Sequence, residues 1–183
     1  MRGVRLIVLT ALLFGAISYT AAAAVAPDTY TPTADSFDSA NAPGSSHVAS
    51  GTPSCTVNSD LSITCSAYVL GGVGHTNADV SLVASYSAII DCNNPSAKNR
   101  NNPIESHTAD FTVSNTATVT SSKNGQLRVP TRSASPFSAP QVCPNDSWVP
   151  EIRDGSVVLN GFLYTVTFDG FDNPYITIQA GTV

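Results

Sequence analysis

Apolar and polar residues alternate one by one along much of this chain. The alternation is clearest in five runs: residues 61–69, 80–90, 109–113, 162–168 and 176–178. A period of two places one set of side chains toward a core and the other toward solvent, as in a β-strand. β-Branched and aromatic residues fill these runs, and no stretch beyond the N-terminal region shows a helical period. The pattern predicts a protein built from strands.

Turn-forming pairs such as Gly-Gly, Asn-Gly and Asp-Gly separate the runs, which favours antiparallel connections. Several short strands with one wet face each predict an antiparallel, immunoglobulin-like β-sandwich over residues 54–183. Within it, Asn160-Gly161 is either a hairpin turn or a bulge inside one long strand. We favour the bulge, because residues 157–159 are too few for a strand of their own.

The N-terminal region has a different pattern. Arg2 and Arg5 precede an apolar run from residue 6 to about residue 17, and alanines follow at residues 21–24. A basic start, a short apolar core and small residues predict a secretory signal peptide over residues 1–24. A membrane anchor would need a longer apolar run, so we expect no membrane span in the mature chain.

Residues 25–53 are rich in Pro, Ser, Thr and Ala and follow neither period, so we interpret them as a flexible linker. Two long loops interrupt the domain that follows, at residues 93–106 and 130–150. The second of these loops holds five prolines. Loops of this length in a compact domain are either functional or pinned to the rest of the fold.

The four cysteines predict two structural disulfides, because export would place them in an oxidising compartment. A turn at residues 59–61 would bring Cys55 opposite Cys65 across a hairpin, within disulfide range. Cys92 and Cys143 would then pair and pin the second loop to the end of a strand. Chain entropy gives about 2.7 kcal/mol for the shorter ring and about 4 kcal/mol for the longer one. The spacing fits neither a redox pair nor a zinc site, and we expect no metal and no cofactor.

The charge balance excludes some partners. The chain has 8 basic and 13 acidic residues, a net charge of −5, and without Arg2 and Arg5 the net charge is −7. An acidic chain without a basic cluster repels phosphate backbones, so we do not expect it to bind nucleic acid. Charged residues make up only 11% of the chain, and a surface of hydroxyls and amides is typical of extracellular proteins. We expect a secreted protein, either free or associated with the cell wall.

Candidate chemistry is sparse. The chain has neither a Gly-x-Ser-x-Gly motif nor a phosphate-binding loop, and we name no catalytic residue. His75 lies in a glycine-rich turn near Asp79 and is the most suggestive histidine. Trp148 and Tyr68, the latter in the outward-facing set of its run, could present an aromatic surface. Trp148, Tyr68 and His75 are therefore our candidate residues for contact with a ligand or partner.

Three stretches carry a resemblance to other proteins: residues 65–99, KNGQLRV at 123–129 and CPNDSWVPEI at 143–152. They resemble small exported four-cysteine proteins of actinobacteria, a group without an assigned activity. The resemblance implies export, the four-cysteine framework and a β-rich fold. In size and in the disulfide hairpin, the chain is also similar to the chromophore-carrier β-sandwiches of actinobacteria, in architecture only.

Together these observations predict a secreted, non-catalytic binding or structural protein. Its partner would be an extracellular ligand or a component of the cell envelope. One alternative is a small-molecule carrier with a cleft at one end of the sandwich. Another is a secreted hydrolase without a recognisable motif, which would need His75 close to an acid and a serine.

Overall fold

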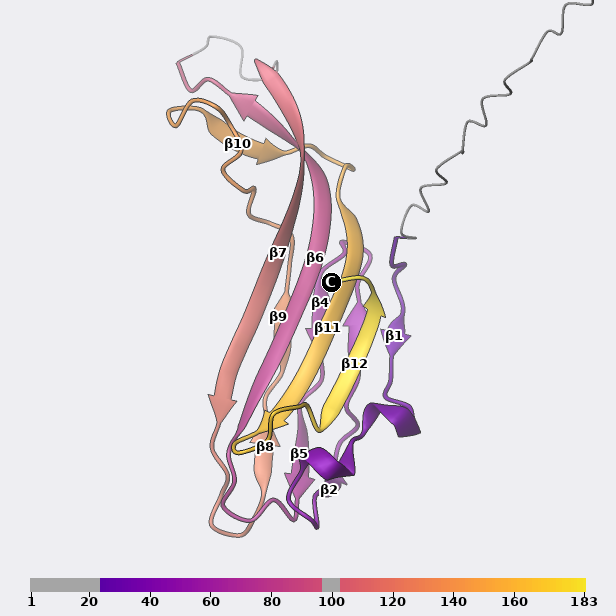
Figure 1. Ribbon diagram of the computed structural model, residues 1–183. Coiled ribbons are helices and arrows are strands. Elements are labelled where there is room, and N and C mark those ends of the chain that lie inside the picture. The colour runs from indigo at the N-terminus through magenta and orange to yellow at the C-terminus, as the bar shows by residue number, and fades with distance from the viewer. Residues whose placement is uncertain (1–23, 97–102) are drawn as a thin grey trace, which may run out of the picture.

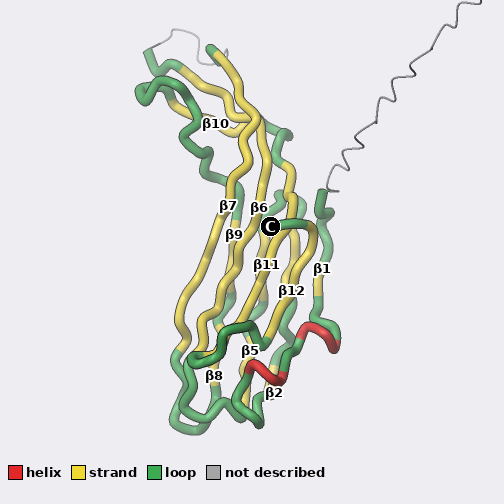
Figure 2. The backbone as a smooth tube through the Cα atoms, in the orientation of Figure 1, coloured by secondary structure: helices red, strands yellow, loops and turns green. Residues whose placement is uncertain are grey.

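The computed structural model describes residues 24–96 and 103–183. The predicted signal peptide lies, apart from its last residue, outside the described residues. Strands dominate the described chain, and its two helices are single 3-10 turns, η1 (Ala34–Ser36) and η2 (Ser39–Asn41), drawn red in Figure 2. The prediction of an all-β, antiparallel fold with two disulfides is confirmed.

One long sheet forms the first layer and is organised around β6 (Ala78–Asn93). Along one edge β6 pairs with β7 (Glu105–Val119) over the full length of β7. The other edge is shared between β11 (Val158–Phe168) and β10 (Val149–Ile152), and β12 (Ile176–Gly181) follows β11. All these pairs are antiparallel, and Figure 1 shows the long strands running side by side.

Two smaller sheets form the second layer. One has the order β1 (Thr29–Tyr30), β3 (Cys55–Val57), β4 (Ile63–Cys65) and β9 (Arg132–Ala134). The other has the order β2 (His47–Ser50), β5 (Tyr68–Gly71) and β8 (Leu127–Val129). Side chains of both small sheets share one buried cluster with β6, β11 and β12, so the two layers enclose a common core.

The alternation of β6 and the register of the β3–β4 hairpin are as the sequence predicts. Every second residue of β6 is buried, and the intervening ones are half-buried or exposed. Cys55 lies opposite Cys65 and Val57 lies opposite Ile63, all four with 2% or less of their surface exposed. The Cys55–Cys65 disulfide joins the two strands across a Cα–Cα distance of 4.0 Å.

The bulge at Asn160-Gly161 is also confirmed. β11 is one strand, and its register against β6 shifts between Leu159 and Gly161. A Cβ atom on Gly161 would lie 2.4 Å from the backbone of Thr182, so no larger residue fits where the C-terminal segment crosses the strand. The bulge therefore requires glycine at this position.

Residues 25–53 do not form the flexible linker that their composition predicts. β1 pairs with β3, and β2 pairs with β5. The ring of Tyr30 meets Phe162 edge-on at a centroid distance of 5.3 Å, and Phe37 meets Tyr175 at 5.9 Å. A few apolar residues spaced along a polar segment are enough to hold it against the core, and average composition conceals them.

The long sheet extends beyond the sandwich as an arm, which we define as residues 88–93, 105–110 and 149–152. Its inner face carries a second, smaller cluster around Ala88, Ile90 and Ala109. The Pro-rich loop, defined here as residues 135–148, packs Ala139 and Val142 against this cluster. The Cys92–Cys143 disulfide fastens the loop to the arm, as the sequence predicts.

Candidate functional site

Three segments that are distant in sequence meet at the base of the arm, and the tip of the β3–β4 hairpin is the first. Asp60 accepts hydrogen bonds from the backbone N–H and the hydroxyl of Ser62, at 3.0 and 2.6 Å. These bonds hold the pKa of the Asp60 carboxyl below its usual range. The hydroxyl of Tyr86, on β6, donates to the carbonyl of Leu61 at 2.9 Å and fastens the hairpin tip to the long sheet.

The second segment is the start of the Pro-rich loop. Pro136 and Phe137 lie one residue beyond the end of β9, and Phe137 leaves 72% of its surface exposed. The loop is anchored on both sides of the ring, because Ala134 is buried and Ala139 packs into the arm. Because the loop is already anchored, binding of a ligand to the exposed Phe137 ring would cost little conformational entropy.

The third segment is the corner between β10 and β11. The N–H of Arg153 donates to the carbonyl of Ile89 at 2.9 Å, and the N–H of Ser156 donates to the carbonyl of Arg153 at 3.1 Å. Gly155 completes the turn in the left-handed region, at a φ of 70°. These bonds fasten the corner to the edge of β6.

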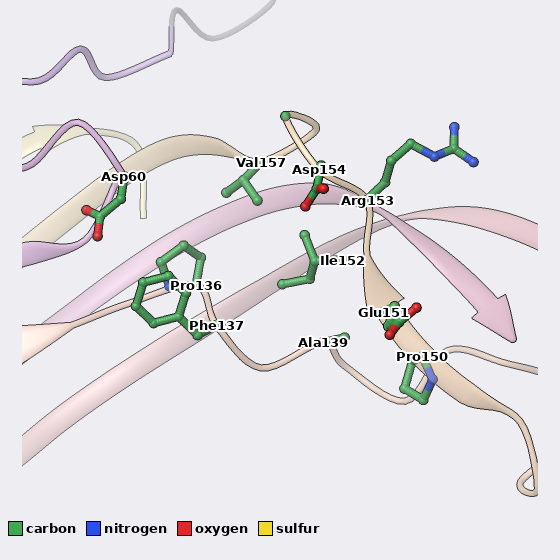
Figure 3. A pocket seen from close by; sticks show the side chains of 11 residues that line it. Asp60, Pro136, Phe137, Ala139, Pro150, Glu151, Ile152, Arg153, Asp154 and Val157 are labelled. Carbon is green, nitrogen blue, oxygen red and sulfur yellow. The ribbon is translucent and has the colours of Figure 1, made fainter. Parts of the chain in front are cut away.

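The Arg153 side chain turns away from the site. Its Nη2 lies 2.6 Å from Oδ1 of Asp91, and its Nε lies 3.1 Å from Oδ2. This bidentate pair lowers the pKa of Asp91 and raises that of Arg153. Figure 3 shows the guanidinium group pointing away from the other lining residues.

The three segments enclose an open groove of about 370 Å³, within the size range of small-molecule sites. Its lining consists of Asp60, Pro136, Phe137, Ala139, Pro150, Glu151, Ile152, Arg153, Asp154, Gly155 and Val157. Phe137, Ile152 and Val157 supply an apolar surface, and Figure 3 shows them on three different segments of the chain.

The polar part of the lining is negative. Asp60 and Asp154 bring two carboxylates, whereas Glu151 and Arg153 lie on the face of Asp91, where Asp91 binds the guanidinium of Arg153 outside the groove. The Glu151 carboxylate accepts a hydrogen bond from Asn93 at 2.7 Å. Asp154 has no side-chain partner within the part of the chain that the structure describes. The groove therefore offers an apolar surface beside unneutralised negative charge.

The reactive side chains of the lining are carboxylates and one guanidinium group. The lining contains no hydroxyl, thiol or imidazole side chain. The lowered pKa of Asp60 is opposite to what a general acid requires at neutral pH. The geometry suits binding of a cation that carries an apolar group.

The candidate contact residues His75 and Trp148 are not brought together. His75 is exposed in the turn between β5 and β6, at the start of β6. Trp148 is half-buried and lies beside the other end of β6, directly before β10. β6 has 16 residues, so its ends lie roughly 50 Å apart at about 3.3 Å per residue.

Tyr68, the third candidate, does not face solvent. It is 4% exposed, and its hydroxyl lies 3.0 Å from that of Tyr164 in the core. Its expected orientation assumed one strand through residues 61–69, but β4 ends at Cys65 and β5 begins in another sheet. Between them, the hydroxyl of Ser66 donates to the carbonyl of Thr52 at 2.6 Å, and the alternation changes phase.

The sequence indicated that the Pro-rich region is either functional or pinned, but it did not identify the residues that form the groove. Phe137 was the detectable signal, because an aromatic residue in a Pro/Ser-rich loop has no strand of its own to pack in. Asp60 and Asp154 gave no signal, since their proximity to Phe137 depends on the fold of three separate segments.

Cys92, Glu105 and His107 form a small cluster on the inner face of the arm. Nε2 of His107 lies 3.0 Å from Oε1 of Glu105. The sulfur of Cys92 is bonded to Cys143 and is not a thiolate ligand. The cluster therefore serves as a polar contact beside the disulfide.

Comparisons with protein-family models, with curated proteins and with solved structures give no match for this chain. Among the described residues, no helix is long and apolar enough to span a membrane. The two disulfides indicate that the chain folds in an oxidising environment.

Proposed function

We propose that this protein is a secreted, non-catalytic binding protein. Its ligand would be a small molecule with an apolar body and a positive charge. The observation that carries the proposal is the groove at the base of the arm, which exposed Phe137 lines together with the acidic residues Asp60 and Asp154. This proposal keeps the binding role expected from the sequence and places it at one end of the sandwich.

Secretion is supported by two independent features. The N-terminal sequence has the order of basic, apolar and small residues that marks a signal peptide. The two disulfides stabilise a fold that would otherwise lack cross-links, as in many exported domains.

The non-catalytic assignment rests on how far apart the reactive side chains lie. His107 belongs to the arm, whereas His75 is exposed before the start of β6 and His47 is exposed on β2 in the second layer. The carboxylate of Asp79, the acid nearest to His75 in sequence, accepts a hydrogen bond from Thr118. A hydrolase would need an imidazole, an acid and a serine within hydrogen-bond reach of one another.

Charge complementarity supports a cationic ligand. A cation in the groove would meet Asp60 and Asp154 without competition from Arg153, which is held by Asp91. An anion of the same shape would be repelled by the same carboxylates. The apolar surface of Phe137, Ile152 and Val157 would bind the body of either molecule equally.

The test uses a matched pair of probes, 1-naphthylmethylammonium and 1-naphthylacetate, which share a ring system and differ in charge. We expect isothermal titration calorimetry of the exported protein to give tighter binding of the cation. Phe137→Ala should weaken it about tenfold, the effect of losing about 1.4 kcal/mol of apolar contact. Asp154→Asn should reduce the preference for the cation.

The control is Val183→Ala, which truncates another exposed apolar residue, 51% accessible, outside the groove. It should leave the binding of both probes unchanged. Failure of both probes to bind, or equal binding that ignores Phe137→Ala, would exclude this groove as the site.

A further inference from the structure

β7 forms one unpaired edge of the long sheet. Along its whole length β7 pairs with β6, without a register shift. Within residues 24–96 and 103–183, no backbone hydrogen bond joins β7 to any other strand. Figure 1 shows this strand forming one side of the long sheet. In an antiparallel pair, alternate residues direct their N–H and C=O groups away from the partner, so about half of these groups on β7 face an empty edge.

Most of this edge lacks the features by which proteins protect free strands. Natural edges are guarded by lysine, by proline, by a bulge or by being short. We call residues 111–119, with the sequence FTVSNTATV, the edge segment. It contains no charged residue, no proline and no glycine, and it is rich in the β-branched residues that favour strand pairing.

Contacts within the single chain already hold the edge segment in place. Nδ2 of Asn115 donates to the carbonyl of Ser133 on β9, at 2.9 Å, and Arg132 donates to Oδ1 of Asn115, at 3.2 Å. The ring of Phe111 stacks on Tyr86 at a centroid distance of 5.7 Å. A strand that is already ordered loses little conformational entropy when another strand joins it.

The sequence of the edge segment complements itself. If two copies meet antiparallel with Asn115 on the two-fold axis, inner-face residues oppose inner-face residues and hydroxyls oppose hydroxyls. The opposed pairs are Phe111 with Val119, Thr112 with Thr118, Val113 with Ala117 and Ser114 with Thr116. Aromatic with β-branched and Thr with Thr or Ser are favourable cross-strand combinations, and the opposed residues of the edge segment carry no charge.

We propose that β7 is a homodimerisation edge, on which a second copy of this chain adds its own β7 antiparallel. The long sheets of the two copies then form one continuous sheet across a two-fold axis. The proposal does not depend on the groove, whose lining residues all lie outside β7.

The test is sedimentation equilibrium of the exported protein from about 1 µM to about 1 mM, a range that covers weak to moderate association. We expect the mass to rise from that of one chain to that of two. Thr112→Lys with Ser114→Lys should raise the dimer dissociation constant at least about tenfold, because the two copies of residue 114 lie diagonally across the axis. Neither residue makes a side-chain hydrogen bond in the described structure, so the fold should be retained.

Two further samples distinguish edge pairing from general charge effects. Thr167→Lys with Gln179→Lys adds the same charge on β11 and β12 and should leave the dimer intact. An equimolar mixture of the double-lysine variant with Thr112→Glu and Ser114→Glu should form heterodimers through opposite charges. Deuterium exchange of residues 111–119 should slow as wild-type concentration rises.

Three outcomes would overturn the proposal. A wild-type protein that stays monomeric at the highest concentration would show that the edge is not self-pairing. A double-lysine variant that still dimerises would place the interface on another surface. Loss of the dimer in the β11–β12 control would attribute the effect to net charge rather than to β7.

Discussion

The hydroxyl groups of Tyr68 and Tyr164 lie 3.0 Å apart in the core and join the two layers of the sandwich. Tyr68 belongs to β5 in the second layer, and Tyr164 belongs to β11 in the long sheet. Both are nearly inaccessible to solvent, at 4% and 1% exposure. Each hydroxyl therefore provides the hydrogen-bond partner that water would provide to an exposed tyrosine.

Removing either hydroxyl should cost more than removing both. We expect Tyr68→Phe and Tyr164→Phe each to lower the free energy of unfolding by about 1–3 kcal/mol, because the remaining hydroxyl stays buried without its partner. The double variant should lose clearly less than the sum of the two. Urea unfolding of all four proteins gives this comparison, and strictly additive losses would mean that the two hydroxyls are not coupled.

Stability should fall at high pH because buried tyrosines resist ionisation. Burial raises the pKa of Tyr86 and Tyr164 to about 12, and raises those of Tyr68 and Tyr175 as well. Unfolded tyrosine ionises near pH 10, so above about pH 10 the unfolded state releases protons first and is favoured. The stabilisation is fully present below about pH 10 and is lost as pH rises toward 12.

Denaturant unfolding between about pH 8 and about pH 11.5, with tyrosinate absorbance recorded in parallel, measures this loss. Each such tyrosine contributes a slope of up to about 1.4 kcal/mol per pH unit. The Tyr68→Phe/Tyr164→Phe variant should decline less steeply. Complete tyrosine ionisation near pH 10 in a protein that remains folded would contradict the prediction.

Tyr30→Ala tests whether residues 25–53 belong to the folded domain. The Tyr30 ring packs edge-on against Phe162, so we expect a loss of about 1–2 kcal/mol in unfolding free energy. Phe137→Ala removes a mostly exposed ring and serves as the control, with little change expected. Equal free energies of unfolding for the two variants would indicate that residues 25–53 are a linker and not part of the folded domain.

The two disulfides should stabilise different parts of the molecule. Cys55 and Cys65 lie in the main core, so Cys55→Ala with Cys65→Ala should speed deuterium exchange throughout the sandwich. Cys92→Ala with Cys143→Ala should speed it mainly in the arm and the Pro-rich loop, which pack in a separate cluster. It should also weaken probe binding in the groove. Identical exchange patterns would show that the arm and the sandwich unfold as one unit.

The sequence was informative wherever a local pattern determined the geometry. An alternation over residues 80–90, interrupted only by the apolar Val83 and Ile89, defines a strand, and the longer β6 contains it. The turn at residues 59–61 determines which residues face each other in the hairpin, so the Cys55–Cys65 pairing followed from counting. In both cases the deciding interactions lie between residues close in sequence.

The predictions from sequence were wrong or incomplete where contacts between distant segments determine the structure. Tyr68 is buried because the chain changes sheets after Cys65, and the alternation alone does not reveal a change of sheet. Polar residues 25–53 are ordered by rings supplied from β11 and the segment before β12. The groove joins Asp60, Phe137 and Asp154, whose proximity follows from the complete fold.

The position of β6 in the long sheet has a consequence for the time course of folding. β6 and β7 are consecutive strands and can close as a local ribbon, but Ala78 at the start of β6 pairs with Phe168, near the C-terminus. In a chain synthesised from its N-terminus, the main core cannot form until β11 and β12 have been synthesised. Contacts this far apart in sequence fold slowly, on the order of milliseconds to seconds. We therefore expect Cys55 and Cys65 to be cross-linked early, and Cys92 to accept Cys143 only late in maturation.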